Sequence, residues 1–410
     1  MNMKQLAKLK KCKRNGERAR PGRSVWRLAK HIQRVILLTA RFAVSHLCAI
    51  GEAPMATAEA AALPILKRIV PTRFVMLVLA CGFLIPVNRT AGAEPVKVRL
   101  GTLAPKGSSY IKHLQVMGEQ WRSAPGGGVQ LTIYADGTMG SEADMVRRMR
   151  LGQLQAALVT TTGLTEIEPA VAGLQTIPKA FRTLEEVDYI GEKLQPMLEK
   201  RLEAKGFVVL FWSDTGFVRF FSKQPMITPD DLRKTKLFIS ANRPAELEVY
   251  RSVGCNAVPL EVADILPGLQ TGLIDCLCMP PTFALATQVD SAAPHMLDMN
   301  WVPLVGAAIV NKKTWDSLSP EAQEVLRKSA REAGKLIKAD GRRENVESIE
   351  AMRKRGLKIH TVTSEINAEW DRTVEQAWLK IRGTVVPADI FDEVMSQLKI
   401  YRAAHEAAGK

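Results

Sequence analysis

The sequence predicts an α/β protein of two lobes. Stretches with the alternating apolar pattern of strands are followed by stretches with the spacing of amphipathic helices, and this order recurs along the chain. The chain has 410 residues, which is enough for two domains of ordinary size with a substantial core. One helical stretch late in the sequence is longer than a single small domain requires, so we expect it to run along both lobes.

The first part of the predicted body alternates strand, helix, strand, helix and strand. The expected segments are 96–103, 109–121, 129–134, 141–152 and 156–160. The second of these helices starts with a good N-cap, Ser141, and Asp144 follows as its capping-box partner. Strands joined by helices imply a sheet with crossover connections.

The same pattern continues toward the long helix. The next expected segments are a helix at 185–204, strands at 207–212 and 236–240, and a helix at 244–253. Ser319 and Pro320 then supply an N-cap and a proline at the first helical position. The helix that follows keeps an apolar stripe to about Arg355 and stops at Gly356. About 35 residues at about 1.5 Å each give a helix of about 50 Å.

The net charge of +15 is concentrated near the N-terminus. Residues 1–93 contain 17 Lys and Arg against 3 Asp and Glu, whereas residues 94–410 contain 40 against 39. A phosphate-binding surface needs clustered cations on the folded body. The nearly neutral body therefore argues against nucleic acid as a partner.

Residues 1–93 are predicted to be a basic leader that includes a signal peptide. Three basic residues precede an apolar run at 74–87, which is shorter than the ~20 residues of a bilayer span. The small residues at 91–93 predict cleavage after Ala93 and a periplasmic mature protein. The alternatives are a membrane anchor, or a lipid anchor at Cys81, although the residues after Cys81 stay apolar.

Residues 1–54 form an unusually long preface to a signal peptide. Met55 would give a leader of ordinary length, so residues 1–54 are interpreted as the product of a mis-assigned start. The alternative is a genuine basic arm.

The body lacks the motifs of common catalytic sites. It contains no GxSxG, HExxH, Walker or GxGxxG motif, and we expect neither a cofactor nor a metal. A Cys-dependent enzyme would need Cys255 or Cys276 beside His295. Buried free thiols are the plainer interpretation of these two residues and of Cys278, because residues that alternate along a strand are poorly placed for a disulfide.

Ligands of open α/β sheets bind outside the carboxyl ends of the strands. The loops expected there contain Gly, Pro and aromatic residues and lie at 103–107, 160–163, 212–216, 239–242 and 276–281. They predict a cleft between the two lobes.

Several motifs then resemble one known family. They lie at 139–142 (MGSE), 231–237 (DLRKTKL), 258–260 (VPL), 269–275 (LQTGLID) and 309–312 (IVNK). In this order and spacing, over about 96–380, the sequence resembles the solute-binding subunits of tripartite ATP-independent periplasmic (TRAP) transporters, DctP family.

The resemblance implies a Venus-flytrap fold with a long helix spanning both lobes. Lobe one would combine 94–215 with about 304–345, and lobe two would combine 216–303 with about 346–410. The protein would act as a monomer, close on a small ligand and deliver it to the integral membrane subunits. No enzymatic activity is implied.

The sequence departs from the family where carboxylates are bound. Members that take carboxylates typically carry an Arg after the DLxGxK motif, and this position matches Phe238. Three further pocket positions match Leu103, Val262 and Met279, which are also apolar. This pattern favours an organic acid with a large apolar part or a neutral apolar compound.

Two alternatives remain for the ligand and its contacts. One is a small dicarboxylate of the four-carbon type, held by Arg219 or Arg243, and the other is an error in matching this stretch to the family. The candidate ligand-binding residues are Leu103, Thr161, Trp212, Arg219, Phe238, Asn242, Val262 and Met279.

Overall fold

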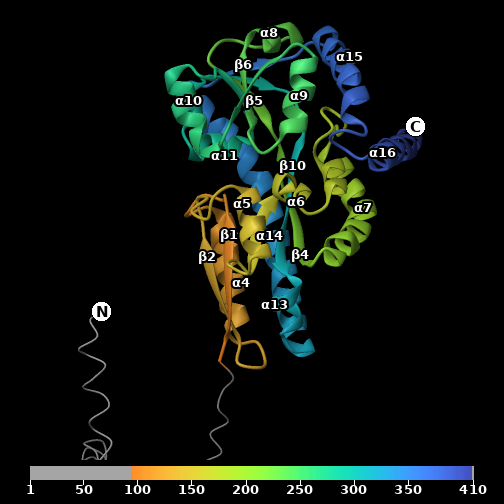
Figure 1. Cartoon of the computed structure of the whole chain (residues 1–410). Coiled ribbons are helices and arrows are strands. Elements are labelled where there is room, and N and C mark those ends of the chain that lie inside the picture. Colours follow the sequence, from red (N-terminus) through yellow and green to blue (C-terminus); the bar gives the residue numbers. More distant parts are fainter. Residues whose placement is uncertain (1–93, 409–410) are drawn as a thin grey trace, which may run out of the picture. The chain divides into compact units, whose positions relative to one another are not determined.

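The computed structural model describes residues 94–408, so the predicted leader and its cleavage site after Ala93 lie outside the described residues. Two β-sheets, each covered by helices, form two lobes of the described chain (Figure 1). The fold predicted from the sequence is confirmed at this level.

The first lobe is built on a five-stranded sheet in the order β2-β1-β3-β10-β4. Its strands are β1 (Val96–Thr102), β2 (Val129–Tyr134), β3 (Ala156–Thr160), β4 (Phe207–Phe217) and β10 (Pro303–Asn311). Its helices are α4 (Ser109–Arg122), α5 (Glu142–Arg150), α6 (Thr161–Thr165), η1 (Pro169–Leu174), α7 (Leu184–Ala204) and α13 (Lys312–Asp316). β1 pairs in parallel with β2 and β3, and β10 runs antiparallel between β3 and β4. The lobe therefore combines two distant parts of the chain.

The second lobe is built on a six-stranded sheet in the order β11-β9-β5-β8-β6-β7. Its strands are β5 (Arg219–Ser222), β6 (Lys236–Ser240), β7 (Asn256–Leu260), β8 (Cys276–Met279), β9 (His295–Asp298) and β11 (Lys358–Thr361). Its helices are α8 (Pro229–Lys234), α9 (Pro244–Ser252), η2 (Val262–Asp264), α10 (Ile265–Thr271), α11 (Pro281–Ala286), α12 (Val289–Ala292) and α15 (Ser364–Ile381). β6 runs parallel to β7 and β8, whereas β5 is antiparallel to β8 and β9.

Both faces of the first sheet are buried. One face packs on α4 and the first half of the long helix through residues such as Trp121 and Ile337, and the other packs on α5, α6 and α7 through residues such as Met145 and Leu198. This double cover explains the nearly continuous apolar runs in the strands.

Two short chain segments and one helix connect the lobes. The chain leaves β4 for β5 at Val218 and returns from β9 to β10 at residues 299–302, and the Val218 amide donates a hydrogen bond to the Val302 carbonyl at 2.9 Å. The helix α14 (Pro320–Lys354, 35 residues) passes from one lobe into the other (Figure 1). It starts at the Ser319 N-cap and Pro320, as the sequence predicts.

Two glycines let α14 lie close to the first lobe. A Cβ at Gly334 would lie 2.6 Å from the Phe211 ring, and one at Gly341 would lie 2.5 Å from the Tyr110 hydroxyl oxygen. Glycine within a helix is less favourable than alanine by about 1 kcal/mol. These glycines therefore allow α14 to pack closely against the first lobe.

The C-terminal helix departs from the expected grouping of the chain. α16 (Ala388–Ala408) was expected in lobe two with the rest of 346–410. It packs instead on α7 and η1 of the first lobe, where Ile390 and Leu398 join the buried apolar core and Arg402 pairs with Glu186 at 2.7 Å. The apolar stripe of α16 fits a surface of the first lobe that the sequence alone does not reveal.

Candidate ligand-binding site

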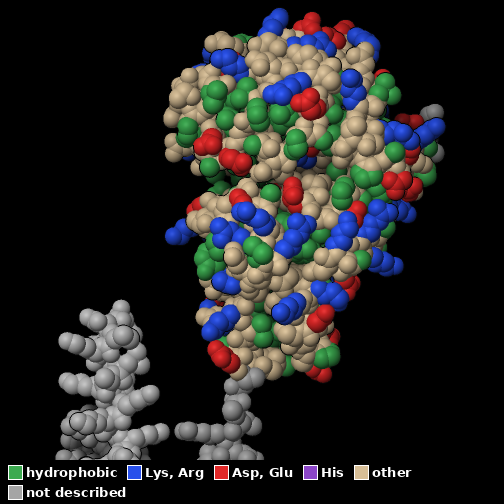
Figure 2. Space-filling view, viewed as in Figure 1, with side chains coloured by type: hydrophobic (Ala, Val, Ile, Leu, Met, Phe, Trp, Pro, Cys, Tyr) green, Lys and Arg blue, Asp and Glu red, His purple; other side chains and the backbone are tan. Residues whose placement is uncertain are grey.

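A cavity of about 1080 Å³ lies between the two lobes. The space-filling view shows the lobes meeting across a groove, with Lys/Arg and Asp/Glu side chains intermingled on this face (Figure 2). Ligand pockets commonly measure about 300–1,000 Å³, so the cavity has ample room for a small organic molecule.

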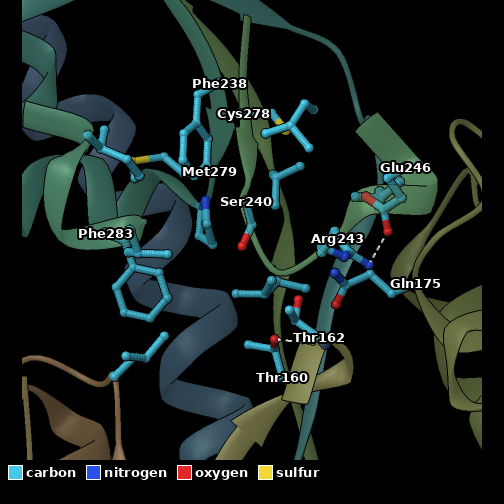
Figure 3. Close-up of a pocket in the computed structure, with 18 of the residues that line it drawn as sticks. Thr160, Thr162, Gln175, Phe238, Ser240, Arg243, Glu246, Cys278, Met279 and Phe283 are labelled. Carbon is cyan, nitrogen blue, oxygen red and sulfur yellow. Dashed lines mark hydrogen bonds and ion pairs between the residues drawn. The ribbon is translucent and has the colours of Figure 1, made fainter. Parts of the chain in front are cut away.

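The wall formed by the second lobe is apolar. Phe238 on β6 and Met279 on β8 line it, together with Phe283 on α11 (Figure 3). Phe238 and Met279 pack in a buried apolar cluster that includes Phe221 and Leu277. The wall is therefore fixed by core packing.

The wall formed by the first lobe carries hydroxyl groups. Thr160 and Thr162, at the junction of β3 and α6, line the cavity (Figure 3). Behind them the Glu142 carboxylate accepts hydrogen bonds from the Thr160 amide at 2.8 Å, the Thr160 hydroxyl at 2.7 Å and the Gly163 amide at 2.9 Å. Burial raises the pKa of Glu142, and these hydrogen bonds oppose the effect. Glu142 thus holds the loop in place.

A partly buried ion pair lies between the two walls. Arg243, at the N-cap of α9, pairs with Glu246 and donates a hydrogen bond to the Thr176 hydroxyl of the first lobe at 3.0 Å (Figure 3). Burial raises the pKa of Glu246, and the charge of Arg243 opposes this rise. Arg243 is thus a cation at the cavity, but one already engaged by a carboxylate.

The cavity continues along one face of α9. Glu246, Val249 and Tyr250 line it at helical spacing, which places them on one side of the helix. Beyond them the lining includes Trp301 and Val374, both buried. The cavity therefore has an apolar branch between α9 and α15.

The three cysteines of the body are free thiols. Burial raises the pKa of Cys255 to about 11 and that of Cys278 to about 12, and it raises the pKa of Cys276 as well. Such thiols are poor nucleophiles at neutral pH. His295 does not line the cavity, and its Nδ1 lies 2.8 Å from Nε2 of His360.

The structure brings most of the predicted contact residues together. Leu103, Phe238, Asn242, Val262 and Met279 line the cavity. Val262 is 48% exposed and lies at the rim. The apolar positions that depart from the family pattern thus face one space.

Three predicted contact residues are placed elsewhere. Thr161 starts α6 and is fully buried inside the lobe, so its neighbours in sequence line the cavity instead. Trp212 points to the α7 side of β4, where its indole N–H donates to Glu199 at 2.9 Å. Arg219 pairs with Asp298 at 3.1 Å and does not line the cavity. The prediction placed Thr161 and Trp212 on loops at strand ends without identifying the direction of their side chains, and it named Arg219 only as a nearby cation.

Sequence reasoning missed lining residues that lie inside helices. Glu246 and Phe283 follow the expected strand-end loops by several residues, and Tyr110 lies in the first turn of α4. The helical spacing of Glu246, Val249 and Tyr250 was a signal that could have identified the α9 face.

Residues 94–408 contain neither a metal-binding cluster nor a membrane-spanning helix. No group of three or more His, Cys, Asp or Glu residues is placed to hold a metal ion there. Among the same residues, no helix is both long and apolar enough to cross a membrane.

A ligand-sized cavity between two α/β lobes, which are joined by two short chain segments and one spanning helix, is the architecture of a two-lobed solute-binding protein. The family model of the bacterial extracellular solute-binding proteins, family 7 (DctP), matches residues 100–383. The chain belongs to this family, which confirms the resemblance found in the motifs.

Known proteins are similar over most of the body. The C4-dicarboxylate-binding periplasmic protein DctP of Rhodobacter capsulatus is 26% identical over 308 residues, which are 73% of this chain and 90% of that protein. The sugar acid binding protein of Advenella mimigardefordensis, solved with galactonate, has a TM-score of 0.69 at 19% identity and covers 75% of this chain and 99% of its own. A TRAP periplasmic solute-binding protein of Ralstonia eutropha, solved with (S)-2-acetolactate, has a TM-score of 0.68 at 18% identity and covers 74% and 98%. The solved structures establish the shared fold.

Proposed function

We propose that this protein captures a small organic solute outside the cytoplasm and passes it to the membrane subunits of a TRAP transporter. The solute is an organic acid with a substantial apolar part, or a neutral compound of similar shape. The observation that carries this proposal is the apolar wall of Phe238, Met279 and Phe283 at the cavity. Apolar area buried there contributes about 25 cal/mol per Å².

Arg243 supports an acidic group on the solute. It is a lining cation with an N–H fork, and a ligand carboxylate near it would compete with Glu246. Arg219 is engaged with Asp298 away from the cavity, so a small dicarboxylate would depend on Arg243. Relatives named for C4-dicarboxylates or solved with sugar acids are consistent with an acid as the ligand class.

Binding without chemical conversion is the remaining part of the proposal. The raised pKa values of the thiols and the lack of a histidine among the described lining residues support it. We further propose cleavage after Ala93 and action as a monomer.

Native mass spectrometry of freshly purified residues 94–410 tests the proposal. We expect the protein to retain an organic compound that is released chemically unchanged on denaturation. Adding this compound back should raise the melting temperature of the protein. Release of a chemically altered product during incubation would show an enzyme, and would contradict the proposal.

A further inference from the structure

The apolar branch of the cavity lies between α9 and α15, which are close neighbours with Cα atoms within 8 Å of each other (Figure 1). On α9 the branch is lined by Val249, Tyr250 and Val253, which share one face of the helix. On α15 it is lined by Thr373 and Ala377, again at helical spacing. The branch therefore follows two facing helix surfaces.

The way α15 packs explains why space remains there. Trp370 and Val374 belong to the apolar core of the second lobe, whereas Ala377 and Ile381, further along the helix, belong to the core of the first lobe. α15 thus passes from one core to the other beside the branch. The small side chains of Thr373 and Ala377 line the branch at this crossing, and neither core fills it.

A molecule in the cavity can reach this lining. Tyr250, Val253 and Thr373 are each half-buried, so their side chains keep accessible surface. Val249 and Ala377 are each 8% exposed. The branch is therefore a surface of the cavity and not the closed interior of a core.

The hydroxyl groups along the branch are already paired within the protein. The Trp301 indole N–H donates to the Tyr250 hydroxyl at 3.1 Å, and the Thr373 hydroxyl donates to the Glu369 carbonyl at 2.9 Å. A ligand group placed beside them does not have to supply a hydrogen bond. An apolar group therefore gains from burial there, whereas a polar group would lose its hydration without a new partner.

Empty apolar space weakens a fold, because the side chains around it lose contacts. Such space stays dry and accepts apolar molecules. Packed helices lie only about 8–10 Å apart, axis to axis. A slender chain therefore fits between α9 and α15 better than a ring does.

We propose that the branch between α9 and α15 is a subsite for an unbranched alkyl tail of the solute. The inference rests on the proposed function and specifies the apolar part of its solute further. An acidic group at Arg243 lies at the start of α9, and from there to Val253 the helix rises about 15 Å. The tail follows this face of α9, while Phe238 and Met279 contact the part of the solute that stays in the main cavity.

Calorimetric titration of wild type uses straight-chain acids of increasing length: butanoate, hexanoate, octanoate and decanoate. We expect affinity to rise about 4-fold for each added methylene until the branch is filled. 4-Cyclohexylbutanoate has as many carbons as decanoate and should bind more weakly, because its ring does not enter the branch.

Matched variants assign this gain to the branch. Thr373→Leu and Ala377→Leu each add apolar volume on the face of α15 that lines it. Gln376→Leu is the control, because Gln376 is an exposed residue of the same helix and does not line the cavity.

The two filled variants should bind decanoate about 10-fold more weakly than wild type does and should bind butanoate equally well. Gln376→Leu should bind both acids as wild type does. Thermal unfolding shows which variants are folded, and either filled variant is sufficient for the test.

Three results would overturn the inference: affinity that does not rise with chain length, a rise that survives in the filled variants, or 4-cyclohexylbutanoate that binds more tightly than decanoate. If native mass spectrometry still finds a retained, unaltered solute, the inference falls alone. If the solute is converted to a product, the proposed function falls instead.

Discussion

The two walls of the cavity differ in chemistry and in what supports them. The first lobe presents hydroxyls such as those of Thr160 and Thr162, held by hydrogen bonds to Glu142. The second lobe presents Phe238 and Met279, held by an apolar core. Under the proposed function, we expect the ligand to have an oxygen-bearing side and an apolar side. Phe238, at the position that the motifs match to an Arg of carboxylate-binding members, lies on the second wall.

The support behind each wall differs as well. An ionic network backs the strand β4 of the first lobe, because Arg342 of α14 pairs with Asp214 of β4 at 2.7 Å and with Asp188 of α7 at 2.6 Å. Apolar packing around Phe221 backs the second wall. A charged side chain introduced by substitution should therefore weaken ligand binding most at the second wall. Acidic pH should instead lower the stability of the first wall's support.

The largest effect is expected from Phe238→Arg. Phe238 is buried in the apolar wall, so the change places a cation without a partner where apolar surface is buried on binding. Affinity for the compound that wild type retains should fall roughly 100-fold. Calorimetric titration with that compound measures the loss.

Two controls accompany this variant. Phe238→Leu keeps the wall apolar and should cost less than about 10-fold. Val262→Arg places the same charge at the exposed rim and should have a small effect. Tighter binding by Phe238→Arg would mean that the solute presents a carboxylate to this wall, and the comparison between the walls would be wrong.

An intermediate effect is expected at the ion pair between the walls. Arg243→Met leaves Glu246 as a carboxylate without its partner, which should destabilise the protein by about 1–3 kcal/mol and lower affinity for an acidic solute about 10-fold. The double variant Arg243→Met/Glu246→Met should recover stability but not affinity. Urea unfolding and titration of both variants provide the measurements. Recovery of affinity in the double variant would assign Arg243 a purely structural role.

The fold could be predicted from the sequence because each helix or strand is indicated by residues that are close together in the chain. The Ser319–Pro320 start of α14 and the capping box of Ser141 with Asp144 both depend on residues a few positions apart. The position of α16 depends on a surface formed by distant residues. No local pattern encodes that surface, so the helix was assigned to the wrong lobe.

The candidate site could be predicted less completely. Strand-end loops located Leu103 and Asn242, and family motifs located Phe238 and Met279, all of which line the cavity. The face of a strand end is set by bulges and by partner strands. β4 has such irregularities where it pairs with β10, and the Trp212 side chain lies on the α7 side of the strand, away from the cavity.

The smallest effect concerns pH and the support of the first wall. Burial opposes ionisation of Asp188, but hydrogen bonds from Arg342 and Lys338 outweigh it, and the pKa of Asp188 is lowered. A carboxyl with a lowered pKa stabilises the fold above its unfolded pKa of about 3.9, and this contribution is lost as pH falls through the folded value. Asp188→Asn should therefore lower the melting temperature by about 2 °C at neutral pH, and the gap should close below about pH 4. Glu350→Gln, which removes an exposed carboxylate from α14, is the control and should show no gap at any pH. Thermal unfolding from pH 3 to 8 provides the test. A gap that does not shrink as the pH falls below about 4 would mean that Asp188 acts through packing, and the ionic account of the first wall would fail.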